Sequence, residues 1–208
     1  MFFSKQMVSR ESSLKGRSEP LEIDDLHYIN QTPMRPPFEM GSELIIFAMG
    51  CFWGAERRFW EQQGVSVTAA VYVGGYTPNP TYEETCSGLT GHTEGVMVVY
   101  DRKNTNLKRL LKVFWESHDP TQGMRQGNDI WTQYRSGIYC NNYDQLQVAL
   151  DSKSAVQNLL TARGFGAITT DIELASDYYY AEGYHQQYLA KNPNGYCGLR
   201  GTGIQCEG

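Results

Sequence analysis

The sequence predicts one α/β domain with a two-layer, plait-like core and long coil at both ends. At 208 residues, the chain is long enough for one sizeable core and too short for two comfortable ones. Between residues 43 and 190, apolar runs and helical patterns follow in the order strand, helix, strand, strand, helix, strand. That order is typical of a split βαβ unit, so we expect a ferredoxin-like βαββαβ core with a mixed sheet.

Short apolar or β-branched runs predict the strands. They span residues 44–49, 65–73, 96–100, 137–140 and 168–174. Apolar residues at helical spacing predict helices over residues 52–63, 106–117, 144–163 and 180–190. Gly64 and Gly164 stand where helix C-terminal caps belong, and Asp119-Pro120 ends the helix before it.

The two ends of the chain differ in composition from the middle. Residues 1–42 are polar and are interrupted by Pro20, Pro33, Pro36 and Pro37, which predicts an N-terminal extension. Residues 191–208 contain five glycines, which predicts a mobile tail. We therefore expect an extension (1–42), a catalytic α/β domain (43–190) and a Gly-rich tail (191–208).

Composition narrows the class of partners. The net charge of −5 provides no basic surface for nucleic acid, and no apolar run approaches the ~20 residues that span a bilayer. The first residues lack the apolar stretch of a signal peptide, and the acids among the first forty argue against a transit peptide. We expect a cytoplasmic monomer. Five cysteines at irregular spacing then favour redox or catalytic chemistry over a disulfide framework.

Cys51 is the candidate nucleophile. It lies between a predicted strand and a predicted helix, where the positive end of the helix dipole lowers a thiol pKa. Phe52 and Trp53 follow at once and can wall an apolar pocket beside the sulfur. The alternative, an inert buried cysteine, stays open on this evidence.

Cys197 and Cys206 strengthen the redox interpretation. Both lie in the Gly-rich tail, where a cysteine has little core to fill and can swing to an oxidised sulfur. Zinc bound by Cys197, Cys206 and His185 is the alternative, although the gap between the two cysteines does not suit usual zinc motifs. A structural disulfide is disfavoured in a reducing compartment.

The run Gly50-Cys51-Phe52-Trp53-Gly54-Ala55-Glu56 resembles the active-site signature of A-type peptide methionine sulfoxide reductases. The resemblance covers nearly everything from residue 43 onward. It continues in motifs that begin at Gly74, Pro80, Gly91, His118, Gln126, Gln133 and Tyr184. The tail motif, residues 192–197, is similar to members with two recycling cysteines.

The resemblance implies a role for each site residue. Cys51 attacks the sulfoxide sulfur, Glu94 is the general acid, and Tyr82 and Tyr134 donate hydrogen bonds to the sulfoxide oxygen. From the residues alone, Glu94 could equally be a solvated charge at a strand edge, and the two tyrosines could simply pack.

Three further residues are implied in substrate binding. Phe52 and Trp53 would hold the S-methyl group, and Asp129 would anchor the substrate backbone or a water molecule. Asp129 could instead be a turn residue or a helix cap.

The family's chemistry implies the rest of the cycle. When the product methionine is released, Cys51 remains as a sulfenic acid. Cys197 condenses with that sulfenic acid to form a disulfide, and Cys206 then replaces Cys51 in the disulfide by thiol exchange. Thioredoxin then reduces the Cys197–Cys206 pair. The implied substrate is methionine S-sulfoxide, free or in oxidised proteins under repair, with no cofactor and no metal.

Two positions depart from the family pattern. Trp131 stands where glycine is expected, which puts the placement of Asp129 and Tyr134 in question, and Gly183 should loosen the predicted last helix. Two other classes remain as competitors: a thiol peroxidase using Cys51, and a non-enzymatic zinc or peptide-binding module. Cys86 and Cys140 are expected to be bystanders.

Overall fold

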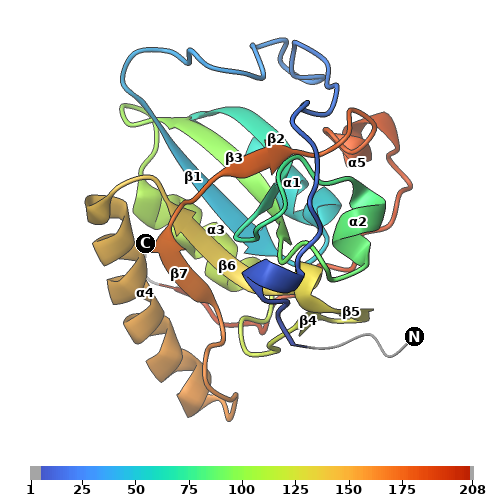
Figure 1. Ribbon diagram of the computed structural model, residues 1–208. Helices are drawn as coiled ribbons and strands as arrows, with labels where there is room; N and C mark the ends of the chain where they lie inside the picture. The colour runs from blue at the N-terminus through green and yellow to red at the C-terminus, as the bar shows by residue number, and fades with distance from the viewer. Residues whose placement is uncertain (1–5, 207–208) are drawn as a thin grey trace.

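A six-stranded mixed sheet forms the centre of the protein in the computed structural model, which describes residues 6–206 (Figure 1). The strands lie in the order β7-β6-β1-β3-β2-β8, with β6 and β7 parallel and every other pair antiparallel. Their bounds are β1 Ser42–Met49, β2 Val65–Val73, β3 Thr93–Asp101, β6 Ser136–Cys140, β7 Asp171–Leu174 and β8 Tyr178–Tyr180. The predicted α/β class with a mixed sheet is confirmed, whereas the ferredoxin-like detail stays a prediction.

Helices and short elements complete the chain. The helices are α1 Phe52–Trp60, α2 Tyr82–Cys86, α3 Leu107–Ser117, α4 Tyr143–Ala162 and α5 Tyr188–Lys191. Two 3-10 turns occupy Arg10–Ser12 (η1) and Thr132–Tyr134 (η2), and a small ribbon pairs β4 Arg125–Gln126 with β5 Asp129–Ile130. None of the helices within residues 6–206 is long and apolar enough to cross a bilayer.

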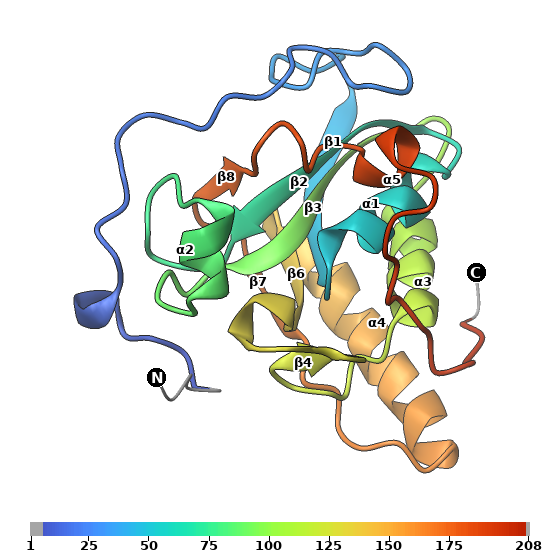
Figure 2. The ribbon, with the colours of Figure 1, turned by 90° about the vertical axis from the view of Figure 1, so that its right-hand side faces the viewer.

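One face of the sheet packs against helices α1, α3 and α4 (Figure 2). Alternate residues of each central strand point to this side, as the period of two along a strand requires. Phe47 of β1 stacks on Phe59 of α1 with ring centroids 4.7 Å apart, and Phe114 of α3 lies 5.4 Å from Phe47. These aromatic contacts fix α1, and the site at its start, against the middle of the sheet.

The other face of the sheet is covered by the N-terminal extension. Ile46, Val71 and Met97 point to this side, and Met34 of the extension is buried among them. The extension therefore packs into a second hydrophobic core, on the face of the sheet opposite helices α1, α3 and α4, and does not trail away from the fold. Residues 1–5 of the predicted extension and 207–208 of the predicted tail lie outside the described range.

The strands and helices predicted before residue 165 are confirmed within a few residues, but the last predicted helix is wrong. Of the residues predicted to be helical, Tyr180 belongs to strand β8, which pairs with the edge of β2, and residues 181–187 form loop and turn. Gln187 adopts a left-handed conformation (φ 47°), so only the short α5 follows it. Gly183 therefore lies outside any helix, and the expected loosening of a helix by this glycine does not apply.

We predict that Met34→Ala lowers the free energy of unfolding by about 2–4 kcal/mol, because it leaves a cavity under the sheet. The matched control is Met40→Ala, whose side chain is fully exposed and should change stability by less than about 0.5 kcal/mol. Urea unfolding measures both. Equal stabilities for the two variants would show that the extension does not cover a core.

Candidate active site

The turn from β1 into α1 determines where Cys51 lies. Gly50 has φ 89°, and a Cβ on it would sit 2.6 Å from the Cβ of Gln126, so the turn requires glycine. Cys51 is consequently the N-cap residue of α1 (φ −51°, ψ 121°). This is the strand-to-helix position that the sequence predicted for the nucleophile.

A cavity of about 140 Å³ opens beside Cys51. It brings together seven of the nine predicted site residues and adds one that sequence analysis missed, Tyr196. The lining residues are Cys51, Phe52, Trp53, Tyr82, Glu94, Asp129, Tyr134 and Tyr196. They come from α1, α2, β3, β5, η2 and the tail, so the fold, not the local sequence, assembles the site.

Glu94 is the acidic group of the cavity. It lies in β3, is 1% exposed, and its Oε2 accepts a 3.0 Å hydrogen bond from the Phe52 N–H. Burial raises the pKa of Glu94 to about 8, since the Phe52 hydrogen bond offsets only part of the desolvation and the charge of Asp129 adds to it. At neutral pH the carboxyl is mostly protonated and can donate a proton.

The helix position does not activate the Cys51 thiol by itself. Burial is the largest effect and raises the pKa of Cys51, and negative charge on Glu94 raises it further. A hydrogen bond from the Trp53 backbone opposes them but is smaller. The predicted lowering of this pKa is therefore wrong: Cys51 is a thiol at neutral pH, because desolvation outweighs the effect of the helix end.

The phenol hydroxyls of Tyr82 and Tyr134 keep their protons at neutral pH and can donate hydrogen bonds into the cavity. Burial raises the pKa of both phenols, and charge on Glu94 raises both further. Tyr82 begins α2, where its backbone N–H donates to Glu182 Oε1 at 2.8 Å. The hydroxyl of Tyr72 donates to the other oxygen of the same carboxylate at 2.9 Å. Glu182, which sequence analysis did not single out, thus ties α2 to β2.

Phe52 and Trp53 form an apolar wall with two residues whose part was not predicted. Trp53 stacks on Tyr188 (centroids 3.9 Å apart, 16° between planes), and its indole N–H donates to His185 Nδ1 at 3.0 Å. Burial lowers the pKa of His185 to about 4, so the ring is neutral and can accept that bond. The only sequence signal was the motif around Tyr184, which carried no role for either residue.

Asp129 is the second carboxyl group that lines the cavity. It is half-buried in β5, and burial raises its pKa. The Tyr196 hydroxyl lies 3.4 Å from each of its carboxylate oxygens. Tyr196 directly precedes Cys197, so this contact tethers the tail to the rim of the site.

The two tail cysteines rest in different places. A Cβ on Gly54 would sit 2.7 Å from the Sγ of Cys197, so that thiol lies against the first turn of α1, near Cys51. Cys206 lies on α3, where its N–H donates to Glu116 Oε1 and its carbonyl accepts from Lys112 Nζ, both at 2.7 Å. Neither thiol lines the cavity, and the mobility of the tail stays a prediction.

The other two cysteines, Cys86 and Cys140, and the acid Glu56 do not line the cavity. Cys140 is buried in β6 as core packing, and Cys86 is half-buried at the end of α2. Glu56 is fully buried and accepts hydrogen bonds from Thr68 and Gln187. Within residues 6–206, no three His, Cys, Asp or Glu side chains gather as metal ligands would.

Comparisons with known proteins agree with this geometry. The family model described as peptide methionine sulfoxide reductase matches residues 43–205. The chain belongs to this family. A peptide methionine sulfoxide reductase from Ectopseudomonas mendocina is 60% identical over 95% of this chain and 90% of that protein. A relative from Synechocystis is 58% identical over 96% of this chain and 90% of its own length.

Two solved structures are also similar to this chain. Methionine sulfoxide reductase A of Corynebacterium diphtheriae superposes with a TM-score of 0.87 at 45% identity, covering 97% of this chain and 98% of that one. The reduced form of Mxr1 from Saccharomyces cerevisiae superposes with a TM-score of 0.69 at 32% identity, covering 77% and 91%. The similarity to the first structure therefore extends over nearly the whole chain, and the similarity to the second over about three quarters of it.

Trp131, which stands where the family pattern leads us to expect glycine, has an unusual backbone. Its φ is 133° and its ψ is 167°, a region that glycine populates readily and tryptophan rarely. It directly precedes η2, the turn that ends at Tyr134. The turn that glycine would allow is thus kept, at a cost in backbone strain.

We predict that Trp131→Gly leaves the free energy of unfolding unchanged or raises it by up to about 1 kcal/mol, because relief of strain offsets the entropy cost of glycine. Urea unfolding measures the change. Trp131→Ala is the control: it removes the same ring but keeps a Cβ, and should be less stable than the glycine variant. A glycine variant less stable than the alanine variant would refute the strain.

Proposed function

We propose that the cavity at Cys51 reduces methionine S-sulfoxide, free and in proteins, and so repairs oxidised proteins. As a member of its family, the chain is an oxidoreductase that converts methionine sulfoxide to methionine. The observation that carries the residue roles is that a protonated, buried Glu94 and the Cys51 thiol share one small cavity with two phenol donors.

The first step needs a nucleophile at sulfur and an acid at oxygen, because oxide is a poor leaving group until it is protonated. In our proposal Cys51 attacks the sulfoxide sulfur while Glu94 protonates the oxygen. Glu94 then recovers a proton from the Cys51 thiol, so one proton moves from sulfur to oxygen overall. This relay explains how a thiol with a raised pKa can still react. The protonated oxygen leaves the substrate sulfur as the bond between the two sulfurs forms, and it then attacks the Cys51 sulfur, which breaks that bond and gives methionine and a Cys51 sulfenic acid.

The selectivity for one epimer follows from two fixed subsites. Tyr82 and Tyr134 keep their protons and would hydrogen-bond the sulfoxide oxygen, while Phe52 and Trp53 would contact the S-methyl group. With oxygen and methyl assigned, attack from Cys51 leaves one side for the rest of the substrate. Asp129, which also lines the cavity, would bind the substrate backbone or a water molecule.

The tail resolves the oxidised enzyme. The Cys197 thiol attacks the Cys51 sulfenic acid, forming a disulfide and releasing water. Cys206 then attacks the Cys197 sulfur, which frees Cys51 as a thiol. The rest position of Cys197 against Gly54 supports the first of these steps. Cys206 must leave its contacts with Glu116 and Lys112, or Cys197 must move to it, for the second.

The reductant that resets the Cys197–Cys206 pair is a dithiol protein, and we propose thioredoxin, whose potential suits reduction of an exposed disulfide. Turnover without a metal or cofactor, as a cytoplasmic monomer, completes the proposal. The reducing cytoplasm keeps the five free thiols reduced between turnovers. The proposal also keeps the division of the chain into an extension (1–42), a catalytic domain (43–190) and a Gly-rich tail (191–208).

Of the two competitors, the thiol peroxidase is the less compatible with the site. Direct reaction with peroxide depends on a thiolate, and burial raises the pKa of Cys51. Sulfoxide reduction needs a proton donor more than a thiolate, and the protonated Glu94 can supply that proton. The zinc module would need Cys197 and Cys206 at one point, whereas they lie against α1 and α3 respectively.

We predict that one equivalent of methionine sulfoxide, added to the reduced protein without reductant, yields about one methionine per chain. Peptide mass spectrometry should then find disulfides only among Cys51, Cys197 and Cys206. Cys51→Ser should release no methionine, whereas Cys140→Ser, the matched control, should behave like the original chain. Full release by the Cys51 variant would sink the proposed nucleophile, and a disulfide to Cys86 would sink the relay.

A further inference from the structure

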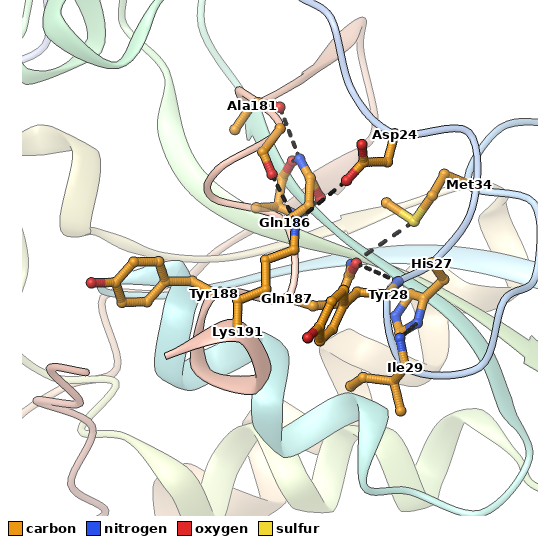
Figure 3. A network of polar contacts seen from close by, with 12 residues as sticks. Asp24, His27, Tyr28, Ile29, Met34, Ala181, Gln186, Gln187, Tyr188 and Lys191 are labelled. Carbon is orange, nitrogen blue, oxygen red and sulfur yellow. Dashed lines mark hydrogen bonds and ion pairs between the residues drawn. The ribbon is translucent and has the colours of Figure 1, made fainter. Parts of the chain in front are cut away.

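A stretch of coil from the N-terminal extension packs behind the apolar wall of the active site. Residues 24–34, which we call the strap, lie against the segment 181–191 that follows β8 (Figure 3). The family model begins at residue 43, so the strap lies outside the part of the chain that it describes. Its contacts nevertheless converge on Gln187, one residue before the aromatic partner of Trp53.

Gln187 joins three parts of the fold. Its side-chain Nε2 donates to Glu56 Oε1 at 2.8 Å and to the Thr68 carbonyl at 3.1 Å, and its backbone N–H donates to Glu56 Oε2 at 2.8 Å. Its Oε1 accepts from the backbone N–H of Tyr28 in the strap at 3.1 Å. Helix α1, strand β2 and the strap thus meet at one side chain that is 1% exposed.

The strap is itself fixed to the sheet beside this point. His27, 1% exposed, pairs its Nε2 with the Thr68 hydroxyl at 3.0 Å. Burial lowers the pKa of His27 to about 4, so the ring stays neutral and the contact persists at physiological pH. Met34 places its sulfur 3.8 Å from Gln187 Nε2. The strap therefore presents the Tyr28 N–H to Gln187 from a rigid base.

Gln187 holds both residues that support Trp53. Tyr188, the next residue, stacks on the Trp53 ring, and His185, two residues earlier, accepts the indole hydrogen bond. Gln187 itself has φ 47°, a conformation that costs a non-glycine residue and persists only when its surroundings over-determine it. The hydrogen bonds to Glu56, Thr68 and Tyr28 are what over-determine it here.

We propose that the strap is a positioning element for the active site: through Gln187 it sets the orientation of Trp53, and with it the fit of the substrate's S-methyl group. This rests on the proposed function for the identity of the group that Trp53 contacts. Because the strap acts on binding and not on Cys51 or Glu94, weakening it should raise KM and leave kcat nearly unchanged.

The test removes one hydrogen bond. Tyr28→Pro deletes the N–H that donates to Gln187, and proline suits this place because Tyr28 follows the first residue of the turn closed by the Gln31 N–H and the His27 carbonyl. Tyr28→Ala is the matched control, since it loses the exposed ring but keeps the N–H. Each full-length variant is assayed for methionine sulfoxide reduction with dithiothreitol.

A second readout reports on Trp53 without any turnover. The indole N–H resonances are recorded by proton–nitrogen NMR, and Trp53 is assigned by its absence in Trp53→Phe. We expect Tyr28→Pro to shift the Trp53 resonance and to raise KM about three- to tenfold, the range that one hydrogen bond accounts for. Tyr28→Ala should match the original chain in both. Failure of the proposed function would appear separately, as no turnover in the original chain.

Two results would overturn the proposal. One is a folded Tyr28→Pro variant with the original Trp53 resonance and KM. The other concerns folding: if Tyr28→Pro does not fold, the same measurements on His27→Asn decide, because asparagine can still accept from the Ile29 N–H but is too short to reach the Thr68 hydroxyl, so it loosens the strap and leaves the bonds from Gln187 to Glu56 and Thr68 in place. A shifted resonance and raised KM there support the proposal. Loss of fold in both variants would assign the strap to stability alone.

Discussion

The hydrogen bond from the Phe52 N–H to Glu94 Oε2, 3.0 Å long, joins the first turn of the nucleophile's helix to the middle of the sheet. One orphan donor at the start of α1 is satisfied by a carboxyl group that burial keeps mostly protonated. The same contact orients the Glu94 side chain toward the cavity where Cys51 ends the turn from β1. The hydrogen bond therefore sets the position of the acid, burial keeps the acid protonated against the opposing effect of that bond, and the chemistry proposed for Cys51 depends on both.

Around this contact the fold supplies supports from distant parts of the chain. Glu182 ties the start of α2, and so Tyr82, to β2. The segment around Gln187 holds Trp53 from behind, with the N-terminal extension packed beneath it. The tail brings Cys197 against Gly54 while Cys206 stays on α3. A site built in this way keeps its acid and its apolar wall rigid and reserves any large movement for the thiols that recycle it.

Much of the strand and helix order could be predicted from the sequence, because short apolar or β-branched runs such as 44–49 and 65–73 end directly at a glycine. The helix predicted over 180–190 failed at its start because Tyr180 belongs to β8, which pairs with a sheet edge, and further on because Gln187 takes a left-handed conformation; both depend on distant partners that local patterns do not contain. The pKa of Cys51 was mispredicted for a similar reason: the helix end is local, whereas the burial that outweighs it comes from the whole fold. Tyr196 and His185 had no signal of their own, since their parts depend on contacts with Asp129 and Trp53.

The pH dependence of kcat/KM for methionine sulfoxide tests the central claim most directly, because it reports the ionisation of the free enzyme. If Glu94 must carry a proton and Cys51 reacts from its thiol form, kcat/KM stays level at neutral pH and falls about tenfold per pH unit above pH about 8. Glu94→Gln should be much slower and should lose that fall. A rate that rises through pH 8 as the thiolate forms would contradict the account, since it would make Cys51 ionisation, and not the buried acid, the requirement for turnover.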